Sequence, residues 1–543
     1  MPSNSIHPKF LWGVGTSSYQ SEGGITNNDW NYFTTSDSIR KRISSLTTPT
    51  IFYKDIRHLQ LQPAANAVRF WENKYYERDF ENAKNMGLNS FRISLEWARI
   101  EPERNQWDQE VLDNYRRMLL SMREKGLEPI VTLNHLTLPL WVLTPPLQFK
   151  KKFYQHFFPH PLRDLPIRDP PSSDPYWKSL RGWENEETVR EFIHFVGKVV
   201  SEFKDLVDYW ITINEPVASI IGGGYLAGIS PPGFILDGRR TKAVLHNLIQ
   251  AHVQAFEKIT EIDDVDSNSD NIPRNVGFSH LMMVTQPLPG KRSLIKLGAA
   301  NSDAAMNFSY FMNDYFLNAV INGEEDLNFL DTLERYNNSS KSFIVHDNWK
   351  QKVDFVGLNY YRRVYIRTSK ILSISDAKFV GGLPISDLSH MKKFQGRVND
   401  LGWEIYPEGL YEILTSLKKW KKPIFITENG VADKSDNLRA RFIIDHMKQI
   451  RRCLDEKVDI IGYLHWSLMD NYEWHEGYNP EGRFGLYSVD RSLTDLPRIM
   501  TKGAIALEKI IRYSDSTNQS GELTERSISK TQEYMKKNYP DII

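Results

Sequence analysis

Eight short runs of apolar and β-branched residues recur along this chain, separated by stretches whose apolar residues follow a helical spacing. Several runs are almost continuously apolar, as expected of parallel strands that are buried on both faces. An eightfold alternation of strand and helix predicts an α/β protein built as a single (β/α)8 barrel, the TIM-barrel architecture. The eight runs are Phe10–Ser18, Ser90–Trp97, Glu128–His135, Asp208–Pro216, Asn275–Val284, Val353–Tyr361, Lys422–Gly430 and Asp459–Leu468. The clearest helical stretches are Asp108–Lys125, Glu186–Phe203, Ala299–Ile321 and Asn437–Cys453.

A doubly wound sheet is the competing architecture, but no glycine-rich phosphate loop follows the first run to support it. A barrel needs about 250 residues, and the chain has 543. We therefore expect a barrel domain over residues 1–513 with long loop insertions. The clearest insertions are near residues 145–177, with eight prolines, 260–274, which are acidic and polar, and 367–397. Residues 514–543 are polar and rich in lysine, and we expect them to form a tail that is only partly ordered.

The composition excludes several classes of protein. The 68 basic residues balance 68 acidic residues, so net charge provides no attraction to nucleic acid or to an anionic membrane. Cys453 is the single cysteine, which excludes an intramolecular disulfide and a multi-cysteine metal site. The N-terminus lacks the apolar run of a secretory signal, and no stretch reaches the about 18 apolar residues of a membrane span. We therefore expect a cytoplasmic protein that does not bind nucleic acid.

Polar side chains gather where the predicted strands end, which is the edge at which barrels of this architecture hold their chemistry. Burying so many polar groups costs free energy unless each is hydrogen-bonded, so their placement favours a site over a core. The polar ends are Asn134-His135, Asn214-Glu215, Asn359-Tyr360-Tyr361, Thr427-Glu428-Asn429, and His465-Trp466 with Asp470–Trp474 beyond it.

Two glutamates stand out among these residues. Glu215 and Glu428 end the fourth and seventh apolar runs, and a chain reversal follows each of them at Pro216 and Gly430. In a closed barrel these two ends can face each other across the axis. Two carboxyls across a cleft can cleave a glycosidic bond, because one can protonate the leaving group while the other attacks. The alternative is that either glutamate caps a helix or pairs with an arginine.

The segments around both glutamates resemble the two catalytic signatures of glycoside hydrolase family 1, the β-glucosidase family. The resemblance covers about residues 8–513 and is carried by Phe10–Gly13, Ser18–Gly23, Phe91–Ser94, Trp97–Pro102, Ile213–Pro216, Ile426–Gly430, Trp466–Trp474 and Arg483–Leu486. It implies a retaining β-glycosidase that hydrolyses a terminal non-reducing β-D-glycosyl residue, with glucose as the expected sugar. The expected partner is a small-molecule β-glycoside or a glycolipid, and no metal or organic cofactor is implied.

The same resemblance implies roles for individual residues. Glu215 would be the general acid/base, and Glu428 the nucleophile that forms a covalent glycosyl-enzyme. In a retaining enzyme the two carboxyls lie about 5–5.5 Å apart. Arg92 and Tyr361 would orient Glu428 and keep it ionised, although the spacing of Arg92 alone would equally fit a structural ion pair.

Sugar recognition would use amide and carboxylate groups on the hydroxyl rim and indole rings on the C–H face of the pyranose. On spacing alone, the histidine and the tryptophans involved would be interpreted as core residues, and the motifs reverse that interpretation. The implied substrate-binding residues are Gln20, His135, Asn214, Asn359, Trp466, Glu473, Trp474 and Phe484.

The chain departs from the family pattern at Leu136, where most members have a tryptophan directly after the strand-three histidine. One indole N–H contact to the sugar is therefore missing, and the choice among glucose, galactose, mannose and fucose stays open. The retained Trp474 sets aside members that act on 6-phosphosugars. The presence of Glu215 sets aside plant thioglucosidases, which lack this acid.

Residues 149–158 interleave three lysines with aromatic rings in a loop expected on the active-site face. A basic aromatic loop of this kind can lie at a lipid headgroup surface, so peripheral membrane contact and a glycolipid or steryl glycoside substrate are one interpretation. The other is a folded insertion whose rings pack on the barrel rim.

Two rival functions use the same fold. A transglycosylase would share the covalent intermediate and pass the sugar to another hydroxyl instead of water. A non-catalytic carbohydrate-binding barrel would need neither carboxyl, and the presence of both argues against it. A metal-dependent barrel is disfavoured, because no His-x-x-x-His pairing occurs at the strand ends.

Overall fold

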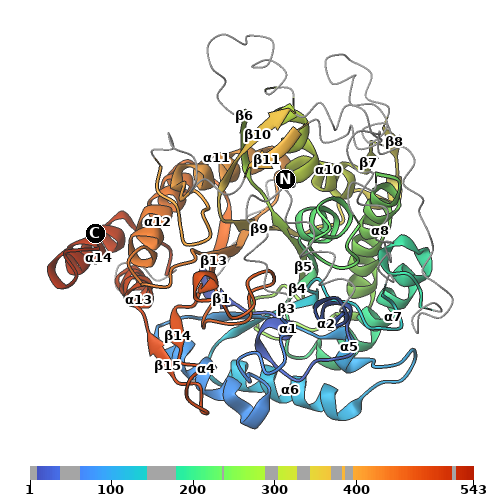
Figure 1. The fold of residues 1–543 in the computed structure, drawn as a ribbon, viewed down its shortest axis with the longest axis horizontal. Helices are drawn as coiled ribbons and strands as arrows, with labels where there is room; N and C mark the ends of the chain where they lie inside the picture. The colour runs from blue at the N-terminus through green and yellow to red at the C-terminus, as the bar shows by residue number, and fades with distance from the viewer. Residues whose placement is uncertain are drawn as a thin grey trace.

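Eight parallel strands close into a barrel at the centre of the molecule (Figure 1). Their order around the barrel is β1-β13-β12-β9-β5-β4-β3-β2. The strands are β1 (Leu11–Gly15), β2 (Ser90–Ser94), β3 (Glu128–Asn134), β4 (Tyr209–Asn214), β5 (Asn275–Leu281), β9 (Phe355–Tyr360), β12 (Ile424–Asn429) and β13 (Ile460–Trp466). Each predicted run contains one of these strands, so the predicted (β/α)8 barrel is confirmed.

The computed structural model describes residues 9–36, 62–143, 179–234, 238–287, 302, 304–326, 343–368, 382–385, 396–515 and 521–542. The predicted insertion at 145–177, including the basic aromatic segment 149–158, lies outside these residues. So does most of the predicted insertion at 367–397. Its described parts are the end of β10 (Arg363–Thr368), strand β11 (Gly382–Ile385), which pairs with β10, and residues 396–397.

Helices surround the barrel and cover the outer faces of its strands (Figure 1). Helix α7 shows why they pack there, because Val189, Phe192, Val196 and Val199 repeat at helical spacing and are all buried. The longer helices are α4 (Tyr75–Asn85), α6 (Gln109–Glu124), α7 (Glu186–Phe203), α8 (Gly238–Ile262), α10 (Tyr315–Asn322), α11 (Pro407–Leu417), α12 (Arg439–Asp455), α13 (Lys502–Asp515) and α14 (Glu525–Asn538). None of the helices in the described part of the chain is both long and apolar enough to cross a membrane.

Shorter elements connect the strands and helices at the rim and on the outside of the barrel. The short helices are α1 (Ser18–Ser21), α2 (Asp29–Thr35) and α5 (Trp97–Ile100), and two π-helical segments are η6 (Pro216–Leu226) and η7 (Tyr310–Asp314). The single 3-10 turns are η2 (Glu72–Lys74), η5 (Gly182–Glu184), η9 (Asp347–Trp349), η11 (Lys418–Trp420) and η12 (Pro480–Gly482). The remaining strands are β6 (Val284–Pro287), β7 (Glu324–Glu325), β8 (Ile344–Val345), β14 (Tyr487–Val489) and β15 (Arg498–Met500).

The polar insertion predicted at 260–274 connects helix α8 to strand β5. Its first residues complete α8, which ends at Ile262. The loop that follows is held by its own side chains, since the Asp266 carboxylate accepts backbone N–H groups from Asp270 at 3.1 Å and Asn271 at 2.8 Å. The acidic side chains of this segment therefore accept hydrogen bonds from the backbone of a loop that has few apolar residues to bury.

An apolar plug fills the interior of the barrel below the strand ends. Its members come from five different strands and are almost completely buried, and Leu11 of a sixth strand packs against them: Ile130, Tyr209, Ile211, Phe355, Phe425, Ile461 and Leu464. Alternate residues on the same strands, such as Trp210 and Ile426, belong instead to the core between strands and helices. The plug leaves the carboxyl ends of the strands as the place where polar side chains can gather.

The C-terminal residues differ from the expectation of a partly ordered tail, since residues 521–542 are part of the folded structure. Helix α14 packs on α13 and α12, and a capping box of Thr524 and Ser527 begins it. Ile528 and Met535 are buried on one face of this helix, and the indole N–H of Trp12 donates to the carbonyl of Gly521 at 2.7 Å. The segment is polar overall, so the prediction overlooked an apolar stripe that follows a helical spacing.

Replacing Ile528 by alanine should therefore destabilise the whole protein. The side chain is 1% exposed, and emptying such a site costs about 2–5 kcal/mol. Thermal unfolding followed by circular dichroism should show a lower Tm for Ile528→Ala. Arg526→Ala, an exposed change on the same helix, should leave Tm close to that of the wild type. Equal Tm values for all three proteins would show that α14 does not contribute to the fold.

Candidate active site

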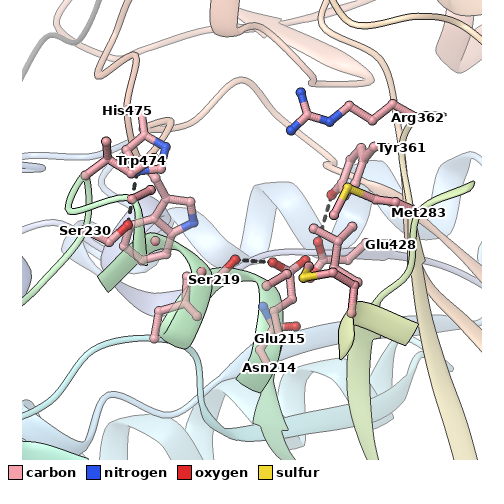
Figure 2. Close-up of a pocket in the computed structure, with 18 of the residues that line it drawn as sticks. Asn214, Glu215, Ser219, Ser230, Met283, Tyr361, Arg362, Glu428, Trp474 and His475 are labelled. Atoms are coloured by element: carbon pink, nitrogen blue, oxygen red, sulfur yellow. Dashed lines mark hydrogen bonds between the residues drawn. The ribbon is translucent and has the colours of Figure 1, made fainter. Parts of the chain in front are cut away.

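A cavity of about 270 Å³ opens at the carboxyl ends of the barrel strands. Glu215, which follows β4, and Glu428, at the end of β12, both line it, and Figure 2 shows them next to each other at its base. The fold thus brings together two carboxyls that lie far apart in the sequence. Other predicted residues that line the cavity are His135, Asn214, Tyr361, Trp466, Glu473, Trp474 and Phe484.

Arg92, on strand β2, ties one of these carboxyls to the neighbouring strands. Its guanidinium group donates to Glu428 Oε1 at 2.7 Å, to Asn214 Oδ1 at 2.8 Å and to Thr132 Oγ1 at 2.9 Å. Arg92 is completely buried, so its ion pair with Glu428 is shielded from solvent. Arg92 thus supplies a positive charge next to Glu428, the position that the family resemblance implied for it.

Glu428 has a second partner on its other oxygen. The hydroxyl of Tyr361 donates to Glu428 Oε2 at 2.7 Å, as the dashed line in Figure 2 shows. Two residues beyond Glu428, at Gly430, a Cβ atom would lie 2.1 Å from the carbonyl oxygen of Trp466. Glycine therefore allows the end of β12 to lie against the end of β13. Both carboxylate oxygens are fixed by donors from other strand ends.

Glu215 has neutral hydrogen-bond partners instead. The side-chain amide of Asn359 donates to Glu215 Oε1 at 2.8 Å, and the hydroxyl of Ser219 donates to Oε2. Glu215 has φ +49°, a left-handed conformation that is unfavourable for a residue with a side chain. This backbone turns the chain from β4 into η6, whose first residue is Pro216. The turn places Ser219 one helical turn beyond the carboxyl that it contacts.

The two environments favour different charge states. Burial and the neighbouring Glu428 carboxylate raise the pKa of Glu215 to about 7. Burial also raises the pKa of Glu428 above its usual value, but the Arg92 guanidinium and the Tyr361 hydroxyl oppose that rise. Because only Glu428 has a cation in direct contact, Glu215 is the carboxyl that holds a proton near neutral pH.

Aromatic rings and polar groups form the wall next to the two carboxyls. The His135 ring stacks against Trp466 at 5.8 Å between ring centroids and against Trp474 at 6.2 Å, and burial lowers the pKa of His135 well below its usual value. The Asn214 side-chain amide donates to Nε2 of the neutral His135 ring at 3.3 Å, so the proton of the ring is on Nδ1. Burial and the Glu476 carboxylate raise the pKa of Glu473 to about 8, so this group can donate a hydrogen bond as well as accept one.

Three of the predicted residues lie behind the cavity wall: Gln20, Arg92 and Asn359 are each 0% exposed. The Gln20 amide group donates to the carbonyl of Tyr472 at 2.7 Å and accepts from Ser17 at 2.7 Å, so its hydrogen bonds hold the loop that carries Glu473. Asn359 contacts Glu215 and accepts at 2.8 Å from Thr427.

The sequence reasoning missed several residues of the cavity. Ser219 could have been found, because a side chain four residues beyond Glu215 lies on the same face of a helical segment. Ser230 and His475 could not, since they are 245 positions apart and meet only in the folded chain, with Ser230 Oγ and His475 Nε2 3.1 Å apart. The apolar side chains of η6 and of the segment around η7 also line the cavity, and no motif marks them.

Among the described residues, Glu101, Glu191 and His194 are close enough together to hold a metal ion. They do not line the cavity. Both oxygens of Glu101 accept hydrogen bonds, from Trp97 Nε1 at 2.7 Å and from the backbone N–H of Asn105 at 2.8 Å, and Arg104 pairs with Glu191. These contacts explain the cluster without a metal ion.

Comparison with known proteins agrees with this geometry. The sequence pattern of glycosyl hydrolase family 1 matches residues 3–152 and 177–516. A β-galactosidase from Pyrococcus woesei is 29% identical over 93% of this chain and 95% of its own length, and β-glucosidase A from Thermotoga maritima is 29% identical over 89% and 93%. The solved structure of a β-glycosidase from Pyrococcus horikoshii superposes with a TM-score of 0.68 at 26% identity and covers 96% of both chains. The chain therefore belongs to glycosyl hydrolase family 1 and is an O-glycosyl hydrolase.

Proposed function

We propose that this protein is a retaining β-glycosidase that removes a terminal non-reducing β-D-glucosyl residue. The observation that carries the proposal is the unequal environment of two carboxyls in one cavity. Glu428 contacts the Arg92 guanidinium and the Tyr361 hydroxyl, whereas the partners of Glu215 are the neutral Ser219 and Asn359. This asymmetry supports an ionised nucleophile beside a protonated acid.

The reaction follows in two steps. In the first, Glu428 attacks the anomeric carbon while Glu215 transfers its proton to the glycosidic oxygen, so the aglycone leaves as an alcohol and a covalent glycosyl-enzyme forms. In the second, Glu215 takes a proton from water, whose oxygen attacks the anomeric carbon and releases Glu428. Esterification removes the negative charge of Glu428, which lowers the pKa of Glu215 between the steps and suits it to act as a base.

The sugar is proposed to bind among Trp466, Glu473 and Trp474, with the rings against its C–H face and the polar groups at its hydroxyls. Asn214, which accepts from Arg92 at 2.8 Å, is proposed to contact the 2-hydroxyl. Leu136 lines the same cavity where most members have tryptophan. The relatives named above include both a β-galactosidase and a β-glucosidase, so a panel of sugars is the direct test of the preference for glucose.

Transglycosylation is the alternative function of the same site. It would proceed through the same covalent intermediate, with a sugar or lipid hydroxyl replacing water in the second step. Analysis of the products formed with and without an added alcohol acceptor distinguishes the two reactions. The glycolipid or steryl glycoside alternative concerns the aglycone and stays a proposal.

Nitrophenol release from nitrophenyl β-glycosides should identify the sugar and the two carboxyls. We expect activity on the glucoside, none in Glu428→Gln, and a loss of about 10²–10⁴-fold in Glu215→Gln on substrates with poor leaving groups. The loss in Glu215→Gln should be much smaller on dinitrophenyl glycosides, because that leaving group departs without a proton. Glu124→Gln, an exposed change, should match the wild type. Activity retained in Glu428→Gln would contradict the proposed nucleophile.

The pH dependence of kcat/KM should have a basic limb near pH 7. Since the pKa of Glu215 is raised to about 7, the carboxyl is neutral below that pH and loses its proton above it. The first step needs the proton, so kcat/KM should fall as the pH rises through this range. A set of initial rates on an alkyl glucoside between pH 4 and 9 measures this limb, and a limb near the usual glutamate value would show that Glu215 is not the acid.

Ser219 should tune the acid/base by its hydrogen bond to Glu215. The hydroxyl stabilises the ionised carboxylate and lowers its pKa, so Ser219→Ala should move the basic limb to higher pH. The same change should slow the second step at neutral pH, because less of Glu215 is available as a base. Ser219→Thr keeps the hydroxyl and should restore the wild-type profile. An unchanged profile in Ser219→Ala would show that Ser219 only fills space.

A further inference from the structure

A buried carboxylate that the proposed reaction does not use lies behind the cavity wall. Glu96 stands between strand β2 and helix α5, is 1% exposed and does not line the cavity. The hydroxyl of Ser18 donates to its Oε2 at 2.8 Å and the hydroxyl of Thr137 to the same oxygen at 3.0 Å. The side-chain amide of Asn28 donates to Oε1 at 3.1 Å. The backbone N–H of Glu96 donates to the Tyr115 hydroxyl at 3.0 Å, so the residue itself is held in place.

The three side-chain donors belong to three different segments next to the site. Ser18 begins helix α1, and Asn28 caps helix α2, which carries the cavity residue Trp30. Thr137 lies in the loop after β3, two residues beyond His135. The helices α1, α2 and α5 lie near the end of β3 (Figure 1). One carboxylate therefore joins the segments that form this side of the barrel mouth.

The loop after β3 contains a strained residue next to His135. Leu136 has φ +74°, a left-handed conformation that is unfavourable for a residue with a side chain. Such a conformation persists only where surrounding contacts fix it. Both His135 and Leu136 line the cavity, so relaxation of this turn would move the imidazole relative to the two carboxyls.

Side chains from three directions fix this turn. The Asn134 amide donates to the carbonyl of Thr137 at 3.0 Å, and the Asp29 carboxylate accepts from the backbone N–H of Leu138 at 2.9 Å. Glu96 supplies the third contact, through the hydroxyl of Thr137. The three contacts come from the end of β3, from α2 and from the residue before α5. Glu96 is thus the group that connects the turn to the end of β2, the strand that carries the buried arginine of the site.

We propose that Glu96 is a positioning residue for sugar recognition, and that it holds the turn after β3 so that His135 faces the sugar. The inference rests on the proposed function, because it concerns how the same cavity recognises the glycosyl residue. A carboxylate suits this role, since it only accepts hydrogen bonds and all three of its side-chain partners donate. Because Glu96 does not touch the substrate, its loss should weaken recognition of a particular hydroxyl and leave both catalytic carboxyls in place.

The test compares nitrophenyl β-glucoside with its 2-, 3-, 4- and 6-deoxy analogues, as ratios of kcat/KM within each variant. These ratios do not depend on the fraction of the protein that is folded. His135→Ala should identify the hydroxyl that the imidazole recognises, because the ratio falls there. Glu96→Ala should lower the ratio at the same hydroxyl by roughly 2- to 10-fold, the range expected for one hydrogen bond between neutral groups. Lower activity with every ratio at its wild-type value would mean general damage and would overturn the inference.

A second pair of variants keeps Glu96 in place. Thr137→Val removes the hydroxyl at almost constant size and should lower the same ratio, and Thr137→Ser should restore it. The matched control is Glu101→Ala, since Glu101 is also fully buried but accepts from Trp97 Nε1 and from the backbone N–H of Asn105. This variant should lower Tm and keep the wild-type ratios. A shift of the ratios in Glu101→Ala equal to that in Glu96→Ala would show that any buried vacancy nearby has the same effect, against the inference.

A double-mutant cycle tests whether Glu96 acts through His135. If it does, Glu96→Ala should lower kcat/KM for the glucoside much less in the His135→Ala background than in the wild type. Equal fold losses in the two backgrounds would overturn the inference. If the wild type cleaves no β-glycoside, the proposed function fails and the inference falls with it. If the wild type cleaves the glucoside and the ratios of Glu96→Ala and Thr137→Val match its own, only the inference fails.

Discussion

Arg92 lies fully buried at the centre of the strand ends, and its guanidinium group joins side chains from three other barrel strands: Thr132, Asn214 and Glu428. A buried charge is tolerated only when it is paired and its remaining donors are satisfied. Arg92 meets this condition only if β2, β3, β4 and β12 end at the right height and in the right order. The barrel closure and the site are thus parts of one arrangement, and loss of either charge would leave the other buried without a partner.

The contrast between the two glutamates follows from this pair. Arg92 contacts Glu428 directly and donates no hydrogen bond to Glu215. Its positive charge therefore stabilises the ionised form of Glu428 much more than that of Glu215. The Glu428 carboxylate then acts on Glu215 by repulsion and adds to the effect of burial on its pKa. Two residues of the same type therefore receive different proton affinities. This is the separation that acid and nucleophile require in general.

The sequence predicted the parts of the molecule that depend on local pattern. Each of the eight barrel strands lies within a predicted run, because a strand buried on both faces must be apolar over its whole length. Asn214, Glu215 and Glu428 were predicted to lie close together for another reason: they stand at the ends of parallel strands, which meet at one edge of the barrel.

The features that the sequence did not predict depend on contacts between distant segments. Helix α14 was expected to be a polar tail, because its apolar stripe of Ile528 and Met535 is narrow. Only the folded chain shows that this stripe packs against α12 and α13. The cavity is also lined by Leu226, Met283 and Phe311, whose side chains would each be interpreted from the sequence as ordinary core. Hydrophobic residues carry no mark of whether they face a core or a cavity, and only the fold decides which.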